Sequence, residues 1–293
     1  MNDREKIIQY AKIMRASADK ILDILEGSNE SFDAAQVAPV EVAATKYEPD
    51  WENWPDAVPG FLISDPTASG ILKRARAVLN MCDLTNLEGR HFLDFGCGDA
   101  SIVREAIERR AASAIGYDIV VDESWDNLEK MDVNLTTNYK LLKHGHYDTI
   151  LLYDVLDHSR NPVQVIQQIR ELVSDRGEVK VRCHPFTSKH ANHVYRTFNK
   201  AYSHFFLSPE ALKEHDPLPV YKMTGVVPTE QYKKWFNDNG FEIRKETIDR
   251  QSPDPICLKN IPRGEIKAII NHEDYQKILE IQFVDYTLTP RLT

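Results

Sequence analysis

The feature that most restricts the fold is a short apolar run that ends in two closely spaced glycines. Residues 91–100 read His-Phe-Leu-Asp-Phe-Gly-Cys-Gly-Asp-Ala, and a helix is predicted to follow over Ser101–Arg110. A strand, a glycine turn and a helix in this order are typical of a βαβ unit that binds a nucleotide-like ligand, because glycine lets the ligand approach the backbone. The residues of the turn predicted to border this ligand are Asp94, Gly96, Cys97 and Gly98.

Downstream of residue 70 the sequence alternates predicted helices with predicted strands. The helices are predicted over 70–83, 101–110 and 162–172, and the strands over 90–95, 114–117, 133–137, 147–153 and 177–182. This alternation predicts an α/β fold, a mostly parallel sheet with helices on both faces. Ligands bind such sheets at the carboxyl ends of the strands, beside the point where the strand order reverses. The residues that follow each strand are therefore the candidates for a site.

An acid, Asp118, ends the second predicted strand 20 residues after Gly98. An acid at this distance from the glycine turn binds ribose hydroxyls in βαβ nucleotide sites. We predict this role for Asp118, with Ile119 beside it; the alternative is a solvated aspartate at a strand end. Asn138 follows the third predicted strand, and its amide can hydrogen-bond a base edge as donor and acceptor.

The glycine turn resembles the cofactor-binding signature of class I methyltransferases, L-D-x-G-C-G-x-G, with Ala100 in place of its third glycine. The likeness covers about residues 88–185, including the fourth strand and the segment Asp154-Val155-Leu156-Asp157-His158, which resembles "DVLEH". It extends loosely to Gln231–Ile243 and to Leu279–Leu288, an expected antiparallel last strand. The resemblance implies a seven-stranded Rossmann-like methyltransferase sheet with an N-terminal helical extension, and S-adenosyl-L-methionine (SAM) as cofactor.

The resemblance also implies roles for individual residues. Asp94, Gly96 and Gly98 would hold the methionine end of SAM, Asp118 the ribose, and Asn138 or Thr137 the adenine. Tyr153 and Asp154 would border the methyl group. Methyl transfer is an in-line displacement, so the protein mainly aligns the reactants, and a base is needed only where the acceptor must lose a proton.

The acceptor side is predicted from a local reversal of charge. The whole chain has a formal net charge of −9, yet Glu178 is the one acid between Arg176 and His204. A positive cleft there would attract a small anionic acceptor. The predicted acceptor contacts are Arg182, Lys189 and Arg196, and the candidate catalytic residues are His184, His190, His193 and Asp154. The alternative is a basic surface helix, predicted to end near His204, with ordinary polar histidines.

A metal site in the same segment is weighed and not expected. Cys183, His184, His190 and His193 are all residues that can bind zinc. However, neighbours at a strand end point to opposite faces, and no second ligand pair is evident. The prediction is therefore that no metal is bound.

The N-terminal part of the chain is predicted to consist of two further segments. Residues 1–27 carry apolar side chains at alternating spacings of three and four, the seam of a short coiled coil. Homo-oligomerisation through this helix and packing on its own domain both remain open. Residues 28–69 are rich in proline but contain Trp51, Trp54 and Phe61, so they are expected to pack on the methyltransferase domain at 70–293; the alternative is a lid that covers a ligand pocket.

Composition restricts the function further. An acidic chain repels phosphate backbones unless it has a basic patch, so nucleic acid is not favoured as a partner. The sequence contains no apolar run of about 18 residues, so no membrane helix is expected. The cysteines are scattered and no signal peptide is evident, so a cytoplasmic protein is predicted. The predicted function is SAM-dependent methyl transfer to an oxygen or nitrogen of a small anionic acceptor. The alternatives are a nucleic-acid or protein methyltransferase, or a noncatalytic SAM-fold assembly protein.

Overall fold

The computed structural model describes residues 48–58, 67–122, 124–125, 133–191, 193–195, 197–215, 226–262 and 275–291. The predicted helix and coiled coil at 1–27, Phe61, and the side chain of Arg196 lie outside the described residues.

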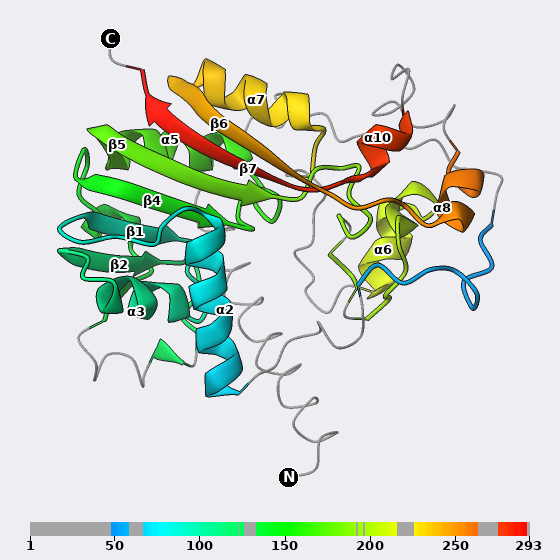
Figure 1. Cartoon of the computed structure of the whole chain (residues 1–293), viewed down its shortest axis with the longest axis horizontal. Coiled ribbons are helices and arrows are strands. Elements are labelled where there is room, and N and C mark those ends of the chain that lie inside the picture. The colour runs from blue at the N-terminus through cyan, green and yellow to red at the C-terminus, as the bar shows by residue number, and fades with distance from the viewer. Residues whose placement is uncertain are drawn as a thin grey trace.

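A seven-stranded sheet forms the body of the molecule, in the order β3-β2-β1-β4-β5-β7-β6 (Figure 1). The strands are β1 (His91–Phe95), β2 (Ser113–Tyr117), β3 (Asn134–Thr136), β4 (Tyr147–Tyr153), β5 (Val173–Cys183), β6 (Phe241–Arg250) and β7 (Ile281–Pro290). Strand β7 runs antiparallel to both of its neighbours, whereas β1 to β5 pair in parallel. The strand order reverses at β1, which lies between β2 and β4, so a ligand is expected at the carboxyl end of β1. The predicted seven-stranded α/β fold is confirmed.

Helices cover both faces of this sheet, because alternate strand residues point to opposite sides. Phe92 of β1 packs with α2 (Ala68–Met81) and α3 (Ser101–Glu108), while its neighbour Leu93 packs with α5 (Pro162–Leu172) and α7 (Thr229–Asp238). Helix α5 begins where its sequence predicts. The Asn161 side chain accepts from the amide of Gln164, and Pro162 occupies the first turn, where its missing N–H has no cost.

A second, smaller hydrophobic core lies at the end of the sheet to which the carboxyl ends of β4 and β5 point (Figure 1). It contains residues 51–57, η5 (Ser203–Phe205) and α8 (Pro255–Asn260), with α10 (Tyr275–Leu279), and α6 (Pro209–His215) lies beside it. Trp54 is buried there and donates from Nε1 to the carbonyl of Ala201 at 2.7 Å. The described part of the proline-rich segment therefore packs on residues 198–206.

The helix predicted to end near His204 is not found. The described residues between 193 and 202 form turns, and the short 3-10 helix η5 follows. His193 and Tyr202 both have φ near +56°, in the left-handed region that interrupts an α-helix. Another short 3-10 helix, η4 (Tyr139–Leu141), follows β3. Within the ranges given above, the helices are too short or too polar to span a membrane.

Candidate active site

The turn after β1 is held by β2 and packs tightly against the segment that follows β4. The amides of Gly96 and Cys97 donate to the carbonyl of Tyr117, at 2.7 and 3.0 Å. Gly96 has φ +85°, and a Cβ there would lie 2.6 Å from Cγ2 of Val155, so no side chain fits. At Gly98, φ is +48° and a Cβ would meet no atom within 4 Å, so the backbone there faces open space. The geometry is that of a turn shaped to admit a ligand.

Asp118 lies at the end of β2 and faces this turn. Its Oδ2 accepts from the Gly98 amide at 2.8 Å, and its Oδ1 accepts from the Val120 amide at 3.4 Å. Burial raises the pKa of Asp118, and the backbone amides lower it in part. The next side chain, Ile119, is 66% exposed, an apolar surface beside the acid. Asn138 is also exposed, and its side chain accepts from the Lys140 amide at the start of η4.

Asp94 is the most deeply buried acid of the turn. It is 1% exposed, and its Oδ2 has no hydrogen-bond partner among the described residues. Burial, together with the neighbouring charges of Asp118 and Asp99, raises the pKa of Asp94 to about 8. A buried carboxyl group without a partner is costly unless a ligand supplies a donor.

Four of the predicted catalytic residues come together where β4 and β5 end. His184 follows β5, and its Nδ1 lies 2.8 Å from Oδ2 of Asp157 and 3.8 Å from Oδ1 of Asp154. His193 Nε2 lies 3.3 Å from the same oxygen of Asp157. The ring of His190 meets that of His184 edge-on, with centroids 4.6 Å apart. We call Asp154, Asp157, His184, His190 and His193 the acid–histidine cluster.

Burial and hydrogen bonds set the charges of this cluster. Burial alone would raise the pKa of Asp157, but hydrogen bonds from His184 and His193 outweigh it and hold that pKa well below its usual value. Burial and the charge of Asp157 raise the pKa of Asp154 to about 7. Burial also lowers the pKa values of His190 and His193. The cluster therefore combines an ionised carboxylate, Asp157, with neutral imidazoles at His190 and His193 and with Asp154, a carboxyl group whose pKa is near neutrality and which can exchange a proton.

Two residues of this region were not singled out as site residues by the sequence reasoning. Asp157 is 0% exposed and is the residue that both histidines contact. His158 packs its ring on that of His193, with centroids 4.0 Å apart. The signal was present in the D-V-L-D-H run, because acids spaced three apart just after a strand can turn to the same side.

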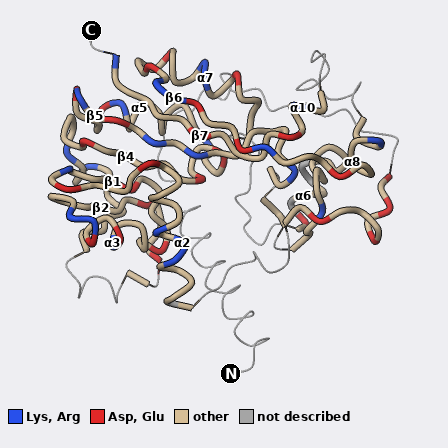
Figure 2. The backbone as a smooth tube through the Cα atoms, viewed as in Figure 1, with Lys and Arg blue, Asp and Glu red and all other residues tan. Residues whose placement is uncertain are grey.

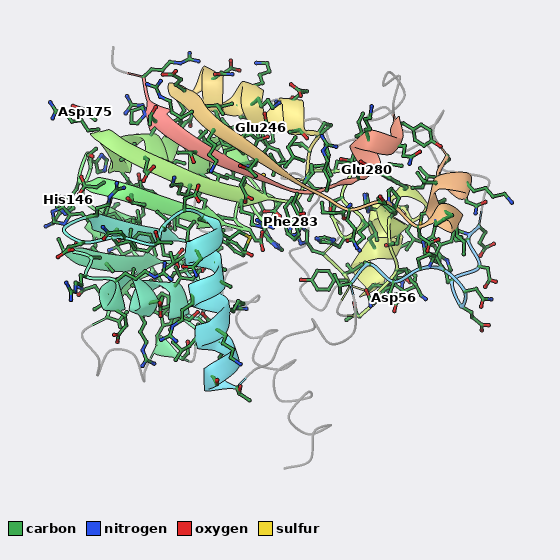
Figure 3. All side chains as sticks on the ribbon, viewed as in Figure 1. Asp56, His146, Asp175, Glu246, Glu280 and Phe283 are labelled. Atoms are coloured by element: carbon green, nitrogen blue, oxygen red, sulfur yellow. The ribbon has the colours of Figure 1, made fainter. Side chains whose placement is uncertain are left out.

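Phe283 of β7 closes the cluster on the side of the second core. Its ring lies 4.5 Å from that of His184 and 5.0 Å from that of His190, centroid to centroid. In Figure 3 it lies between the opposite end of β4 and β5, where His146 and Asp175 are labelled, and the second core near Glu280 and Asp56. The cluster thus occupies the boundary between the two hydrophobic cores.

Most described cations of the basic segment have acidic partners. Arg182 is 4% exposed, and its Nη1 lies 3.0 and 2.9 Å from the two carboxylate oxygens of Asp285. Its guanidinium also stacks on Phe283, 3.9 Å from the ring centroid, and lies 5.9 Å from that of Tyr153. Lys180 pairs with Glu178 at 3.0 Å, and Lys200 with Asp56 at 3.5 Å. Lys189 is partly buried, and burial lowers its pKa. The positive charge expected from the sequence is therefore largely neutralised.

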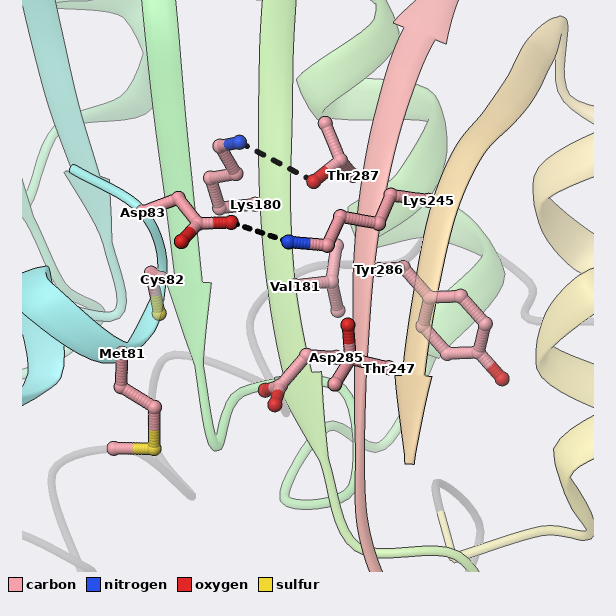
Figure 4. Close-up of a pocket in the computed structure, with 10 residues that line it drawn as sticks. All are labelled: Met81, Cys82, Asp83, Lys180, Val181, Lys245, Thr247, Asp285, Tyr286 and Thr287. Carbon is pink, nitrogen blue, oxygen red and sulfur yellow. Dashed lines mark hydrogen bonds and ion pairs between the residues drawn. The ribbon is translucent and has the colours of Figure 1, made fainter. Parts of the chain in front are cut away.

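A separate cavity of about 210 Å³ lies beside the end of α2, against the middle of β5, β6 and β7 (Figure 4). The charged groups around it bind one another. Lys245 pairs with Asp83 at 2.6 Å, and Lys180 donates to Thr287 at 3.2 Å. The candidate site is instead at the carboxyl ends of the strands, where the glycine turn, Asp118 and the acid–histidine cluster gather.

Fold and site together define a class I methyltransferase. The chain belongs to the methyltransferase-domain family, whose model matches residues 69–246, and it is a SAM-dependent enzyme. It is 23% identical over 226 residues to a ubiquinone biosynthesis O-methyltransferase of Pseudomonas paraeruginosa, covering 73% of this chain and 85% of the relative. It is 33% identical over 91 residues to a ribosomal protein L11 methyltransferase of Photorhabdus laumondii, covering 29% of this chain and 31% of the relative.

Solved methyltransferases are also similar to this chain. A SAM-dependent methyltransferase of Archaeoglobus fulgidus aligns with a TM-score of 0.49 and 15% identity, over 78% of this chain and 99% of its own. Magnesium protoporphyrin IX methyltransferase of Synechocystis aligns with a TM-score of 0.45 and 16% identity, over 75% of this chain and 83% of its own.

The residues around the glycine turn fit SAM. The buried Oδ2 of Asp94, which has no partner among the described residues, would suit a cationic ammonium donor, and the open space at Gly98 leaves room beside the backbone. Asp118 would be the residue to hold the ribose hydroxyls, and the exposed side chain of Ile119 would offer an apolar surface to the base. When bound, SAM supplies an activated methyl group on a sulfonium.

Proposed function

We propose that this enzyme transfers the methyl group to an oxygen of a small molecule that carries an ionisable hydroxyl group. The observation that carries the proposal is the acid–histidine cluster at the ends of β4 and β5. Val155, which touches Gly96 of the SAM-binding turn, lies between two of its members, Asp154 and Asp157. The groups that can take a proton are therefore next to the cofactor turn.

The choice of oxygen rests on proton chemistry. A neutral amine already has a free electron pair, whereas a hydroxyl group must lose its proton as the new bond forms. Carboxylates and neutral imidazoles are suited to take that proton. The same choice is supported by the relatives that are named O-methyltransferases, because the alignment with this chain covers most of their length.

The choice of a small acceptor rests on burial. His184, His190 and His193 all have side chains that are buried or nearly so, and Phe283 and the second core lie against them. The partly exposed side chain of Asp154 gives access to these groups, which suits an acceptor small enough to enter beside it. In the view of Figure 2, Lys and Arg are interleaved with Asp and Glu along the described elements.

The sequence predicts a small anionic acceptor, and we propose that the negative charge is that of the reacting oxygen. Because Arg182 is already bonded to Asp285, the acceptor need not arrive with a charge that this guanidinium would bind. The negative charge develops on the hydroxyl oxygen as its proton passes to the cluster. Lys189 and Arg196 remain the candidates for holding any further acidic group.

The test is a methyl-transfer screen with isotopically labelled SAM. Matched small molecules would be offered that carry a phenol or enol hydroxyl, an amine in its place, or a methoxy group in its place. Transfer to the hydroxyl compounds and to neither counterpart is expected, with at least a tenfold loss in a His184→Asn variant that still binds S-adenosylhomocysteine. Transfer mainly to amines, to RNA or to a protein substrate would overturn the proposal.

A further inference from the structure

A group of two histidines and two aspartates lies around one point of the acid–histidine cluster. One nitrogen of His184, one of His193 and one oxygen of Asp157 all lie within 4.8 Å of one another. The two nitrogens are 2.8 and 3.3 Å from the Asp157 oxygen. Ligands bonded at about 2.0–2.1 Å in a tetrahedral zinc site are separated by roughly 3.3 Å. The three atoms therefore need only a small outward shift to surround an ion.

A second observation concerns the buried oxygens beside this group. Oδ1 of Asp154 and Oδ1 of Asp157 are both buried and have no hydrogen-bond partner among the described residues. Oδ1 of Asp154 is 3.8 Å from His184 Nδ1, so it faces the same point. In the described part of the chain, the ion-pair partners of these two carboxylates are histidines. Buried carboxylate oxygens without a hydrogen-bond donor are costly, and a divalent ion matches their charge.

The surroundings also hold the candidate ligands in place. Phe283 and His158 pack on the rings of His184 and His193. The His184 backbone is fixed as well, since its amide donates to Asp157 and its carbonyl accepts from Tyr232. Such outer contacts orient ligands at metal sites. Asp154 has a side chain that is 29% exposed, so the group can be reached from its side.

We propose that Asp157, His184 and His193 bind a divalent transition-metal ion such as Zn²⁺, with Asp154 beside the open coordination position. Two imidazoles and one carboxylate, with a position left open, are typical of catalytic zinc sites. This proposal departs from the expectation of no metal, because the sequence reasoning did not consider Asp157 as a ligand and the structure places it against both histidines. The inference deepens the proposed function and rests on it only for the role of the ion, which is to bind the acceptor oxygen so that its proton passes to Asp154, the carboxylate beside the open position.

The binding test uses the full chain, with Co²⁺ as a spectroscopic probe. Chelator-treated protein would be titrated with Co²⁺ and with Zn²⁺ by absorption and calorimetry, and S-adenosylhomocysteine binding would be measured in parallel. We expect about one ion per chain, at least a tenfold weaker affinity in His193→Gln and in Asp157→Asn, and no change in His144→Gln. His144 is exposed and lies away from the cluster, so it is the matched control.

A second readout needs no substitution, because buried variants can fail to fold. Proton NMR of the Co²⁺-loaded wild type should show two hyperfine-shifted imidazole N–H signals, one for each histidine ligand. A wild type that binds S-adenosylhomocysteine but not Co²⁺ or Zn²⁺, or a bound ion without imidazole ligands, would overturn the metal site. Hydroxyl methylation that survives chelation unchanged would overturn the role of the ion but leave the proposed function intact. Metal binding without hydroxyl methylation would count against the proposed function alone.

Discussion

Gly96 shows how one missing side chain can position two parts of a site. Its φ of +85° is in the left-handed region, and its Cα hydrogen faces the stiff, β-branched side chain of Val155. The glycine turn, which we expect to bind SAM, and the segment that carries Asp154 and Asp157 are therefore in direct contact. A change of either residue alters the distance between the methyl donor and the acid–histidine cluster.

We expect Gly96→Ala to destabilise the protein by about 3 kcal/mol, from backbone strain and overpacking together. Gly89→Ala is the control, since Gly89 also has a positive φ, +74°, but a Cβ there would meet no atom within 4 Å. It should cost about 1 kcal/mol. Urea denaturation would measure both, and equal costs would contradict the contact with Val155.

Asp118 should contribute to SAM binding through its charged carboxylate. Asp118→Ala is expected to weaken binding of S-adenosylhomocysteine about 100-fold in calorimetry, because hydrogen bonds to a charged group are worth about 1.5–3 kcal/mol each. Asp175→Ala is the control, because Asp175 lies at the start of β5, at the opposite end of the strand from the site (Figure 3); it should leave the affinity unchanged. Similar affinities for wild type and Asp118→Ala would rule out the ribose role.

Because the pKa of Asp94 is raised, we expect the free energy of unfolding of the apoprotein to depend on pH. Its folded pKa of about 8 is above the usual value for aspartate, so the folded apoprotein keeps a proton that the unfolded chain releases. Its contribution to stability therefore falls as pH rises from about 4 to 8 and is constant above that. Asp94→Asn should lose this dependence in denaturation experiments, measured as the difference from wild type at each pH.

The same carboxyl group should release a proton when SAM binds. At pH 7 an ammonium group beside Asp94 would favour the ionised form, so binding should expel up to about one proton. Calorimetry in buffers of different ionisation enthalpy measures this number directly. No proton release in the wild type, or the same release in Asp94→Asn, would show that the ammonium is held elsewhere.

At the scale of elements, the pairing of β5 with β7 determines which acid Arg182 binds. The antiparallel register places Arg182 opposite Asp285, so the two side chains form a buried ion pair. We expect Asp285→Ala to cost about 3 kcal/mol in the free energy of unfolding, because it leaves a buried guanidinium with only the more distant, exposed Asp249. Asp238→Ala, which removes an exposed pair within α7, should cost less than about 0.5 kcal/mol. Equal costs would mean that Arg182 is solvated.

This pair also shows where sequence reasoning stops. Strand β4 and helix α5 could be predicted to the residue, because their apolar periods and the Asn161–Pro162 start are local signals. Arg182 and Asp285 are 103 residues apart, and only the register of β5 and β7 brings them together. The proximity of His184 and Asp154 followed from their places at the ends of β5 and β4, whereas His190 and His193 come from the turns after β5. The central role of Asp157 did not, because its burial depends on residues from three separate segments.

At the scale of the whole molecule, two hydrophobic cores meet at the acid–histidine cluster. The smaller core is held to residues 48–58 by hydrogen bonds from the Ala201 amide to Pro55 and from the Val58 amide to Asn199, both at 2.9 Å. Trp54→Ala should loosen this segment by removing a buried indole and its hydrogen bond. Hydrogen exchange at Ala201 and Val58 should then accelerate at least tenfold, with strands β1 and β4 unchanged. Uniform acceleration throughout the chain would show instead that the two cores unfold as one unit.

The excursion between β6 and β7 leaves the sheet and returns to it at neighbouring points. Arg250 pairs with Ile281, and the Gln251 amide donates to the carbonyl of Glu280 at 2.8 Å. The intervening residues 251–280 therefore form a closed detour whose two ends already sit side by side, as at the tip of a hairpin. A short turn could join those ends without stretching either strand. This segment, which contributes Cys257, Ile261 and Leu279 to the second core, could therefore be exchanged as a unit while the strands that carry the glycine turn stay unchanged.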